Sequence, residues 1–191
     1  MSMEFSAVLL SAGQSTRMGR DKALLPINGG VLWQRQWDLL GAVGVSDRWL
    51  SARAEQAWVP DGIAIARDRM TGAGPLAGIA AALEQMSGTH LIVLAVDLPR
   101  MEPAWFEKLK SLCSPGVGAV GQRDGFYEPL AAIYPRELAR DAVARLIRGE
   151  YALQRFITAA GAAMQSVEIG AAEAAWFANW NEREDLTANQ A

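Results

Sequence analysis

Short apolar runs along the chain alternate with stretches in which apolar residues recur at helical spacing. Residues 5–10 (FSAVLL) form an apolar run directly before a glycine-rich segment, which predicts a central parallel strand. Residues 48–52 (RWLSA) and 62–66 (GIAIA) predict two more strands. Residues 90–96 (HLIVLAV) are the strongest strand candidate, and their apolar character predicts burial on both faces.

Helices are predicted between these strands. The first has an apolar face at helical spacing from Leu32 and closes near Gly41. The second begins at Pro75 and ends at Gly88, and a third begins at Pro103. Because strands alternate with helices, the pattern predicts an α/β domain with a mostly parallel central sheet.

The second half of the chain continues the pattern less regularly. Residues 117–122 predict a strand, residues 123–125 (RDG) a turn, and residues 126–134 an extended return strand that Pro129 marks as an edge or a bulge. The remaining expectations are helices over 137–148 and 152–160, strands over 165–169 and 175–180, and a closing helix over 182–190.

Composition indicates an ordinary globular protein. The 191 residues are 51% hydrophobic and 20% charged, which suits one domain over residues 1–191 with a full-sized core. The formal net charge is −3 and there is no long basic run, so we expect no binding to nucleic acid. The N-terminus lacks the basic region of a signal peptide, and no apolar stretch reaches the roughly 18 residues of a membrane span. We therefore expect a soluble, cytoplasmic protein that does not bind membranes.

Cysteine and histidine are too scarce for several common active sites. Cys113 is the one cysteine, so an internal disulfide is impossible and a reducing compartment is expected. His90 is the one histidine, so a Cys/His zinc site and a Ser-His-Asp triad are both hard to build.

The glycine-rich segment after the first strand, SAGQSTRMGRDK, is the first candidate for chemistry. Backbone N–H groups in such a loop can surround phosphate oxygens without obstruction by side chains. The spacing of Gly13 and Gly19 fits neither the Walker A pattern nor the dinucleotide fingerprint. Arg17 can bind phosphate with two hydrogen bonds, and Lys22 supplies a point charge. The alternative is a solvated turn whose charges face water.

Three further features carry weaker signals. Asp97 follows the strongest predicted strand, where a carboxylate can hold Mg²⁺ beside substrate phosphates, or can simply cap the turn before Pro99. Residues 72–78 (GAGPLAG) place glycines, including Gly74, at a helix start that attracts anions, or form a simple loop entry. Asn179 and Asn181 would share one face of an extended strand and could reach a metal, although asparagine pairs often cap turns.

Taken together, the motifs LLSAGQSTRMGRDK, GPLAGI, VDLP and NWNEREDL resemble those of the molybdenum cofactor guanylyltransferases, a family of the nucleotide-diphospho-sugar transferase superfamily. The resemblance covers the chain from about residue 5 to residue 186. It implies a Rossmann-like α/β/α sandwich that uses Mg²⁺ and transfers GMP from GTP to the terminal phosphate of molybdopterin, with release of pyrophosphate. Transient contact with proteins that deliver the molybdenum cofactor is a further expectation.

The resemblance also implies roles for individual residues. The nucleotide would lie along Leu10, Ser11, Ala12, Gly13 and Gly74, while Arg17 and Lys22 would neutralise its triphosphate. Asp68 matches the family carboxylate that faces guanine. Asp97 matches the metal ligand, and Asn181, with Asn179, matches a late asparagine pair at the active site. The catalytic set is then Arg17, Lys22 and Asp97.

Three departures from the family pattern concern the base and the acceptor. The family usually has Ala-Gly-Gly where this chain has Ser11-Ala12-Gly13, and the Ala-Gly ending is more like related cytidylyltransferases. Ser51 stands where relatives often carry an asparagine that touches the base. Glu128 stands where a neutral residue or histidine is more usual.

Two other readings therefore stay open. One is a cytidylyltransferase for the same pterin, or a nucleotidyltransferase for a sugar phosphate or small alcohol phosphate. The other is a nucleotide-binding partner protein without turnover, although such a protein has no need of Asp97 as a metal carboxylate.

Overall fold

The computed structural model describes residues 2–11, 21–27, 29–53, 56–67, 70 and 72–179. An eight-stranded sheet runs through them in the order β10-β7-β9-β6-β1-β4-β5, with β8 beside β7. The strands are β1 (Phe5–Leu10), β4 (Arg48–Ser51), β5 (Ala64–Ile65), β6 (His90–Ala95), β7 (Gly118–Arg123), β8 (Phe126–Tyr127), β9 (Ala131–Pro135) and β10 (Met164–Glu168).

Strand direction defines two edges of this sheet. β1 pairs in parallel with β4 and β6, β4 with β5, and β7 with β10. β9 runs antiparallel between β6 and β7. The expected mostly parallel sheet is confirmed. Its carboxyl edge is where β1, β4, β6 and β7 end and where β9 begins.

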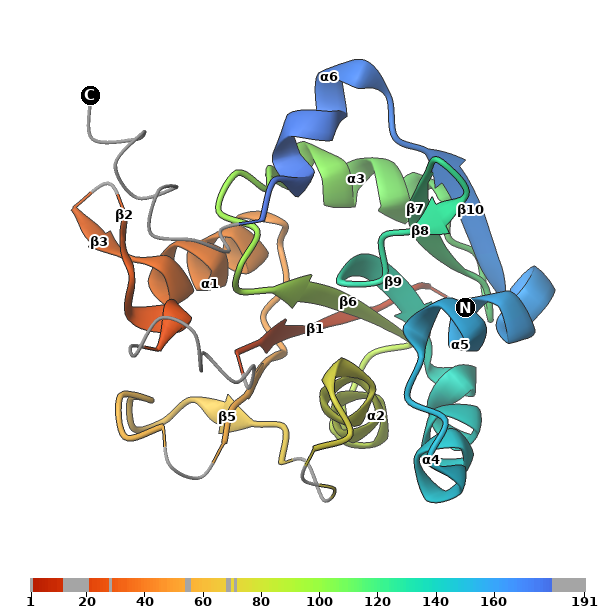
Figure 1. The fold of residues 1–191 in the computed structure, drawn as a ribbon, viewed down its shortest axis with the longest axis horizontal. Coiled ribbons are helices and arrows are strands. Elements are labelled where there is room, and N and C mark those ends of the chain that lie inside the picture. Colours follow the sequence, from red (N-terminus) through yellow and green to blue (C-terminus); the bar gives the residue numbers. More distant parts are fainter. Residues whose placement is uncertain are drawn as a thin grey trace.

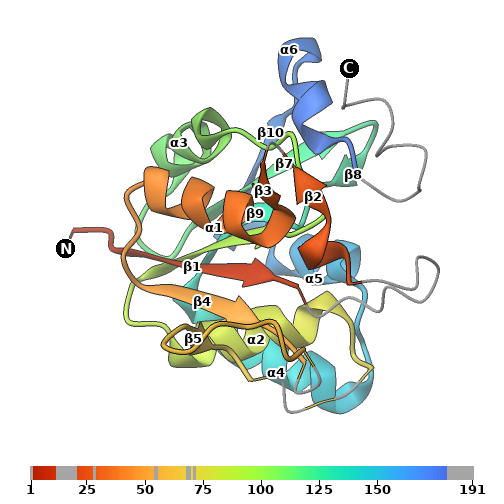
Figure 2. The same cartoon turned by 90° about the vertical axis from the view of Figure 1, so that its left-hand side faces the viewer.

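Helices cover both faces of the sheet, which confirms the α/β/α sandwich (Figures 1 and 2). One face carries α1 (Leu32–Ala42), α3 (Pro103–Leu112) and α6 (Ala171–Ala174), and the other carries α2 (Pro75–Gln85), α4 (Ala139–Arg148) and α5 (Leu153–Ala160). A short helix, η1 (Lys22–Leu24), and a small hairpin of β2 (Pro26–Ile27) and β3 (Gly30–Val31) precede α1.

The core is built on alternation along the central strands. Every residue of β6 is buried, as predicted. Ile92 and Leu94 face the layer of α1 and α3, whereas Leu91 and Val93 face the layer of α2 and α4. A strand with helices on both sides must be apolar on both faces, which explains why the sequence predicts this strand correctly.

The structure corrects three expectations in the second half of the chain. Residues 126–134 do not form one strand, because Glu128–Leu130 separate β8 from β9. Pro129 lies in that break, and β9 is an interior strand rather than an edge. Residues 175–177 form a 3-10 turn, η4 (Ala175–Phe177), instead of a strand, because Phe177 turns inward to pack edge-on against Trp105 at 4.9 Å. The helix expected over 182–190 lies outside the described residues.

Candidate active site

The ends of β1 and β4 are tied together at the carboxyl edge. Ser11 follows β1, and both its N–H and its hydroxyl donate to the carbonyl of Ser51, at 2.9 and 3.0 Å. On the other side of β1, the N–H of Val96 donates to the carbonyl of Leu10 at 3.0 Å. These hydrogen bonds fix the residues that follow β1 beside the ends of β4 and β6. Ligands of parallel sheets bind beyond such carboxyl ends of strands.

Lys22 and Asp97 meet at this edge although they lie 75 positions apart in the sequence. Lys22 Nζ lies 3.9 Å from Asp97 Oδ2, and the two side chains are 22% and 28% exposed. Burial raises the pKa of Asp97, and the Lys22 charge and a backbone hydrogen bond oppose that rise. Lys22 and Asp97 are therefore partly buried but still accessible, and together they present a positive and a negative charge to the same ligand.

The donor set at Asp97 fits a hard divalent cation. Among the described residues, no group of three His, Cys, Asp or Glu side chains lies close enough to hold a metal on its own. Mg²⁺ does not need one, because it commonly takes one or two carboxylates and completes its shell with water and substrate phosphates. Asp97 suits this kind of Mg²⁺ binding, because its partial burial makes a nearby positive charge favourable.

Leu10 and Gly74 are described, but neither offers a side chain to a nucleotide. The Leu10 side chain is buried in the core that faces α2. Gly74 is the residue before the first turn of α2, with φ 67° and ψ −161°, a conformation that favours glycine. Both can contact a ligand only through their backbone.

The other predicted site residues lie outside the described residues. They are Ala12, Gly13, Arg17, Asp68 and Asn181. Asn179 is exposed and is the last residue that the structure describes.

Ser51, which stands where relatives often carry an asparagine, is buried at the end of β4. Its side chain is 2% exposed and lies under α2, where a Cβ at Gly78 would come within 2.5 Å of Ser51 Oγ. The hydroxyl is therefore packed between β4 and α2.

Glu128 lies at the same edge, in the break before β9. Its N–H donates to the Gly121 carbonyl at 2.8 Å, and its carboxylate lies 3.9 Å from Arg123. Burial raises the pKa of Glu128, and the Arg123 charge opposes the rise. The negative charge that looked out of place in the sequence is thus partly neutralised by a neighbouring strand.

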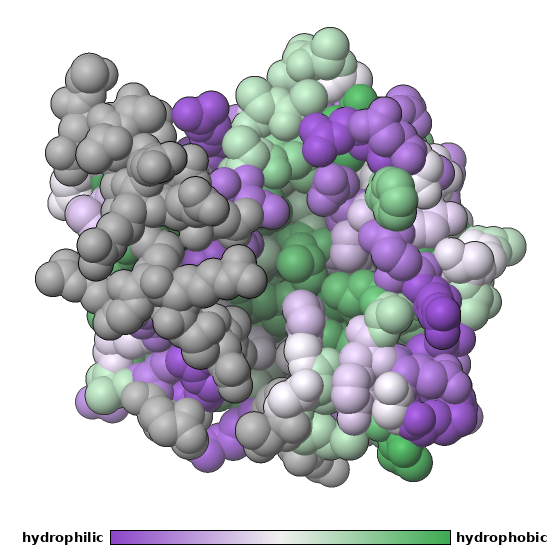
Figure 3. Space-filling view, viewed as in Figure 1, coloured by the Kyte–Doolittle hydropathy of each residue, from purple (hydrophilic) through white to green (hydrophobic). Residues whose placement is uncertain are grey.

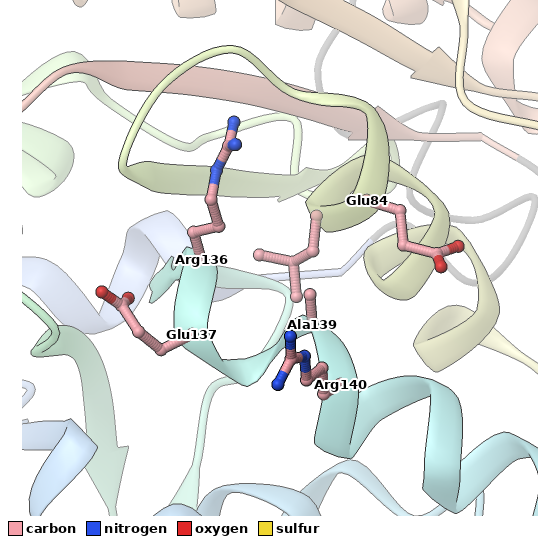
Figure 4. A pocket seen from close by; sticks show the side chains of 6 residues that line it. Glu84, Arg136, Glu137, Ala139 and Arg140 are labelled. Atoms are coloured by element: carbon pink, nitrogen blue, oxygen red, sulfur yellow. The ribbon is translucent and has the colours of Figure 1, made fainter.

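A cavity of about 510 Å³ lies at the opposite edge of the sheet (Figure 4). It is lined by Leu83, Glu84, Arg136, Glu137, Ala139 and Arg140. Arg136 donates to the carbonyls of Gly88 and Met86 and so ends α2. With two glutamates on the wall and one arginine bound to backbone, this cavity is a poor anion site. The face shown in Figure 3 is instead hollowed near its middle, with hydrophobic residues at the base of the hollow.

Sequence reasoning missed Gln56, Asp21 and Trp58, whose side chains join at the carboxyl edge. Asp21 adjoins Lys22 in the sequence, but nothing local indicates that Gln56 and Trp58 lie beside it.

Comparison with solved structures gives the fold first. The fold is shared with proteins named for nucleotide transfer or dinucleotide biosynthesis. Molybdopterin-guanine dinucleotide biosynthesis protein A from Archaeoglobus fulgidus superposes with a TM-score of 0.77 at 22% identity, covering 97% of this chain and 96% of that one. The 2-C-methyl-D-erythritol 4-phosphate cytidylyltransferase from Thermus thermophilus gives 0.71 at 17% identity, covering 96% of each chain. The fold alone therefore does not distinguish guanine from cytosine as the base of the nucleotide.

Sequence similarity then gives the family. Residues 7–166 match the MobA-like NTP transferase domain. A protein from Opitutus terrae named "probable molybdenum cofactor guanylyltransferase" is 42% identical over 185 residues, which cover 94% of this chain and 92% of that protein. The chain belongs to the MobA-like family of nucleotidyltransferases. In the described part of the chain, no helix is long and apolar enough to cross a membrane.

Proposed function

We propose that this protein transfers GMP from GTP to the terminal phosphate of molybdopterin, with Mg²⁺, and releases pyrophosphate. The observation that carries the proposal is the Lys22–Asp97 pair at the carboxyl edge of the sheet. It is supported by the family and by the relative from Opitutus terrae, whose printed name states a guanylyltransferase.

The proposed reaction needs no nucleophile from the chain. An oxygen of the pterin phosphate attacks the α-phosphorus of GTP, a new P–O bond forms, and the bond from the α-phosphorus to the oxygen that bridges it to the β-phosphorus breaks. The released pyrophosphate carries away that oxygen and its electron pair. Such transfers depend mainly on positioning and on stabilisation of charge, which agrees with a chain that has one histidine and one cysteine.

Each charged residue then has a defined task. Lys22, together with Arg17, neutralises the triphosphate and its leaving pyrophosphate. Asp97, with Asn181, would hold the metal ion. Bound there, Mg²⁺ would supply additional positive charge at the phosphate oxygens. Compared with open solvent, the partly buried setting strengthens the attraction of Lys22 for the phosphate oxygens and the attraction of Asp97 for a cation.

We assign the selection of guanine over other bases to Asp68. Guanine presents N1–H and N2–H donors side by side, and one carboxylate can accept both. Cytosine presents one amino donor beside two acceptors, so a carboxylate in the same place would face lone pairs. A buried group left unpaired costs about 1–3 kcal/mol, which favours GTP over CTP and ATP by at least about tenfold.

The test is pyrophosphate release with Mg²⁺ and molybdopterin, measured for GTP, CTP and ATP at equal concentration. We expect the wild type to favour GTP and Asp68→Ala to lose most of that preference while triphosphate affinity stays largely intact. A wild type that favours CTP would replace the guanylyl proposal with the cytidylyl one, which Ala12 in the first motif already supports.

A further inference from the structure

Gln56 contacts both ends of the glycine-rich loop. Its Nε2 donates to the carbonyl of Ser11, which precedes residues 12–20, at 3.0 Å, and to Oδ2 of Asp21, which follows them, at 2.6 Å. Gln56 lies in the segment after β4 and is 6% exposed. One buried side chain thus spans the two chain positions on either side of residues 12–20.

The amide of Gln56 is itself held in place. Its Oε1 accepts from the N–H of Arg53 at 2.7 Å, so both N–H groups and the oxygen are used. Ser11 is in turn bonded to Ser51 at the end of β4. The fixed reference for the loop is therefore β4, a strand of the central sheet.

Asp21 is the second fixed point. Its Oδ1 accepts from the N–H of Ala23 at 3.1 Å, which starts η1, and its Oδ2 also accepts from Trp58 Nε1 at 2.8 Å. The Trp58 ring packs against Trp33 of α1, with 5.5 Å between ring centroids. Both carboxylate oxygens therefore accept hydrogen bonds from the chain, and these bonds fix the orientation of the Asp21 side chain.

From this geometry we infer that Gln56 is a positioning residue for Lys22. It ties the loop ends to β4 through Ser11 and Asp21, and Asp21 directly precedes the lysine that faces Asp97. This inference rests on the proposed function, because it assigns to Lys22 the binding of the triphosphate.

The network is poorly explained as a device for stability alone. A carboxylate and an amide withdrawn from water lose hydration, and such polar groups often stabilise a protein no more than apolar residues of similar volume. What a satisfied polar network provides is a single arrangement of the groups that it joins. Here those groups are both ends of the loop and the residue before Lys22.

The experiment compares binding of a triphosphate and its nucleoside to Gln56→Met, which keeps the length of the side chain and removes all three hydrogen bonds. We expect triphosphate affinity to fall about tenfold, while nucleoside affinity changes less than about twofold, because the proposed role of the displaced lysine is to bind the phosphates and not the nucleoside. In a Lys22→Ala background, Gln56→Met should cause no further loss of triphosphate affinity, since the residue that it positions is absent.

Two more variants keep the test interpretable. Trp58→Phe removes one hydrogen bond to Asp21 and keeps a ring against Trp33, so it should give a smaller loss of the same kind if Gln56→Met folds poorly. Asp47→Asn disrupts a comparable network at the opposite edge of the sheet and should leave triphosphate affinity unchanged. The inference would be overturned if Gln56→Met lowered the affinities for triphosphate and nucleoside equally. It would also be overturned if Gln56→Met lowered triphosphate affinity by the same factor in the Lys22→Ala background as in wild type.

The probe separates this inference from the proposed function. Wild type is first titrated with GTP, CTP and ATP, and the tightest binder is used with its own nucleoside. If that binder is CTP, the guanylyl proposal fails while the role of Gln56 is still tested. If wild type binds none of the three, both proposals fail.

Discussion

At the scale of single residues, the charge of Asp97 carries most of the proposed chemistry. We expect Asp97→Asn to lose at least about a hundredfold of Mg²⁺-dependent turnover, because an amide cannot balance a divalent cation. Its ion pair with Lys22 is long, at 3.9 Å, and burial already disfavours the charged form. The free energy of unfolding should therefore change by no more than about 0.5 kcal/mol.

The matched control is Asp124→Asn. Asp124 also lies 3.9 Å from a cation, Arg123, but it is 89% exposed on the turn between β7 and β8. This variant should keep both turnover and stability. Near-normal turnover in a folded Asp97→Asn protein would remove Asp97 from the metal site.

Cys113 offers an independent test of local packing. Its side chain is 8% exposed and its Sγ donates to the Leu109 carbonyl, and burial raises the pKa of the thiol to about 12. Because the thiolate is the reactive form, iodoacetamide at pH 8 should label the native protein at least about a hundredfold more slowly than the unfolded chain. Labelling at equal rates would mean that the end of α3 opens readily.

At the scale of elements, the contact between α2 and the sheet depends on a glycine inside a helix. A Cβ at Gly78 would lie 2.5 Å from Ser51 Oγ and 2.9 Å from Leu10 Cδ2. Gly78→Ala improves helix propensity by up to about 1 kcal/mol, but overpacking of this kind costs about 1–3 kcal/mol. We expect a net loss of stability, measured by urea unfolding.

Gly41→Ala is the control for helix propensity. Gly41 lies in α1, and a Cβ there would meet only the end of the Arg48 side chain. Arg48 Nη1 donates to the Trp37 carbonyl at 2.8 Å, and moving it costs about 1 kcal/mol, which is similar to the gain in helix propensity, so Gly41→Ala should be close to neutral. If both glycine variants behave alike, the close packing of α2 on β1 and β4 is not what requires Gly78.

The elements that could be predicted from sequence are those whose signal is local. β6 and the start of α2 carry theirs in a continuous apolar run and in Pro75. The break between β8 and β9 does not, because it is set by contacts with distant strands. The N–H of Glu128 bonds to Gly121, and the carbonyl of Leu130 bonds to Ala95. A run of β-forming residues cannot reveal where such partners interrupt it.

The same distinction holds for the candidate site. Lys22 and Asp97 could be assigned to one place because the ends of parallel strands meet at one edge of a sheet. Gln56 could not, since its partners Ser11 and Asp21 lie 45 and 35 positions away. An isolated glutamine in a loop has no pattern that distinguishes it from a solvated one.

At the scale of the whole molecule, the two edges of the sheet carry different polar networks. The carboxyl edge holds Lys22, Asp97 and Gln56, and the amino edge holds Asp47. Asp47 Oδ2 accepts from the hydroxyls of Ser6 and Ser87 and from the N–H of Ser87, and its Oδ1 accepts from Trp49. These bonds join the starts of β1 and β4 to the turn before β6, so they stabilise the fold without touching the candidate site.

The pH dependence of stability tests this division. Partial burial raises the pKa of Asp47, but the hydrogen bonds from Ser6, Ser87 and Trp49 outweigh it, so the pKa lies below its usual value. A lowered pKa means that the carboxylate stabilises the native state above about pH 4, the usual pKa of aspartate, and that this contribution disappears as pH falls through the lower native value.

Asp47→Asn should therefore reduce the free energy of unfolding by roughly 1–2 kcal/mol at pH 7, a value that allows for the partial exposure of the group. The gap between wild type and variant should narrow below about pH 4, whereas turnover at pH 7 should stay within about twofold of wild type. A gap that is constant with pH would show that the charge of Asp47 does not hold the amino edge, and a large loss of turnover would show that the two edges are coupled.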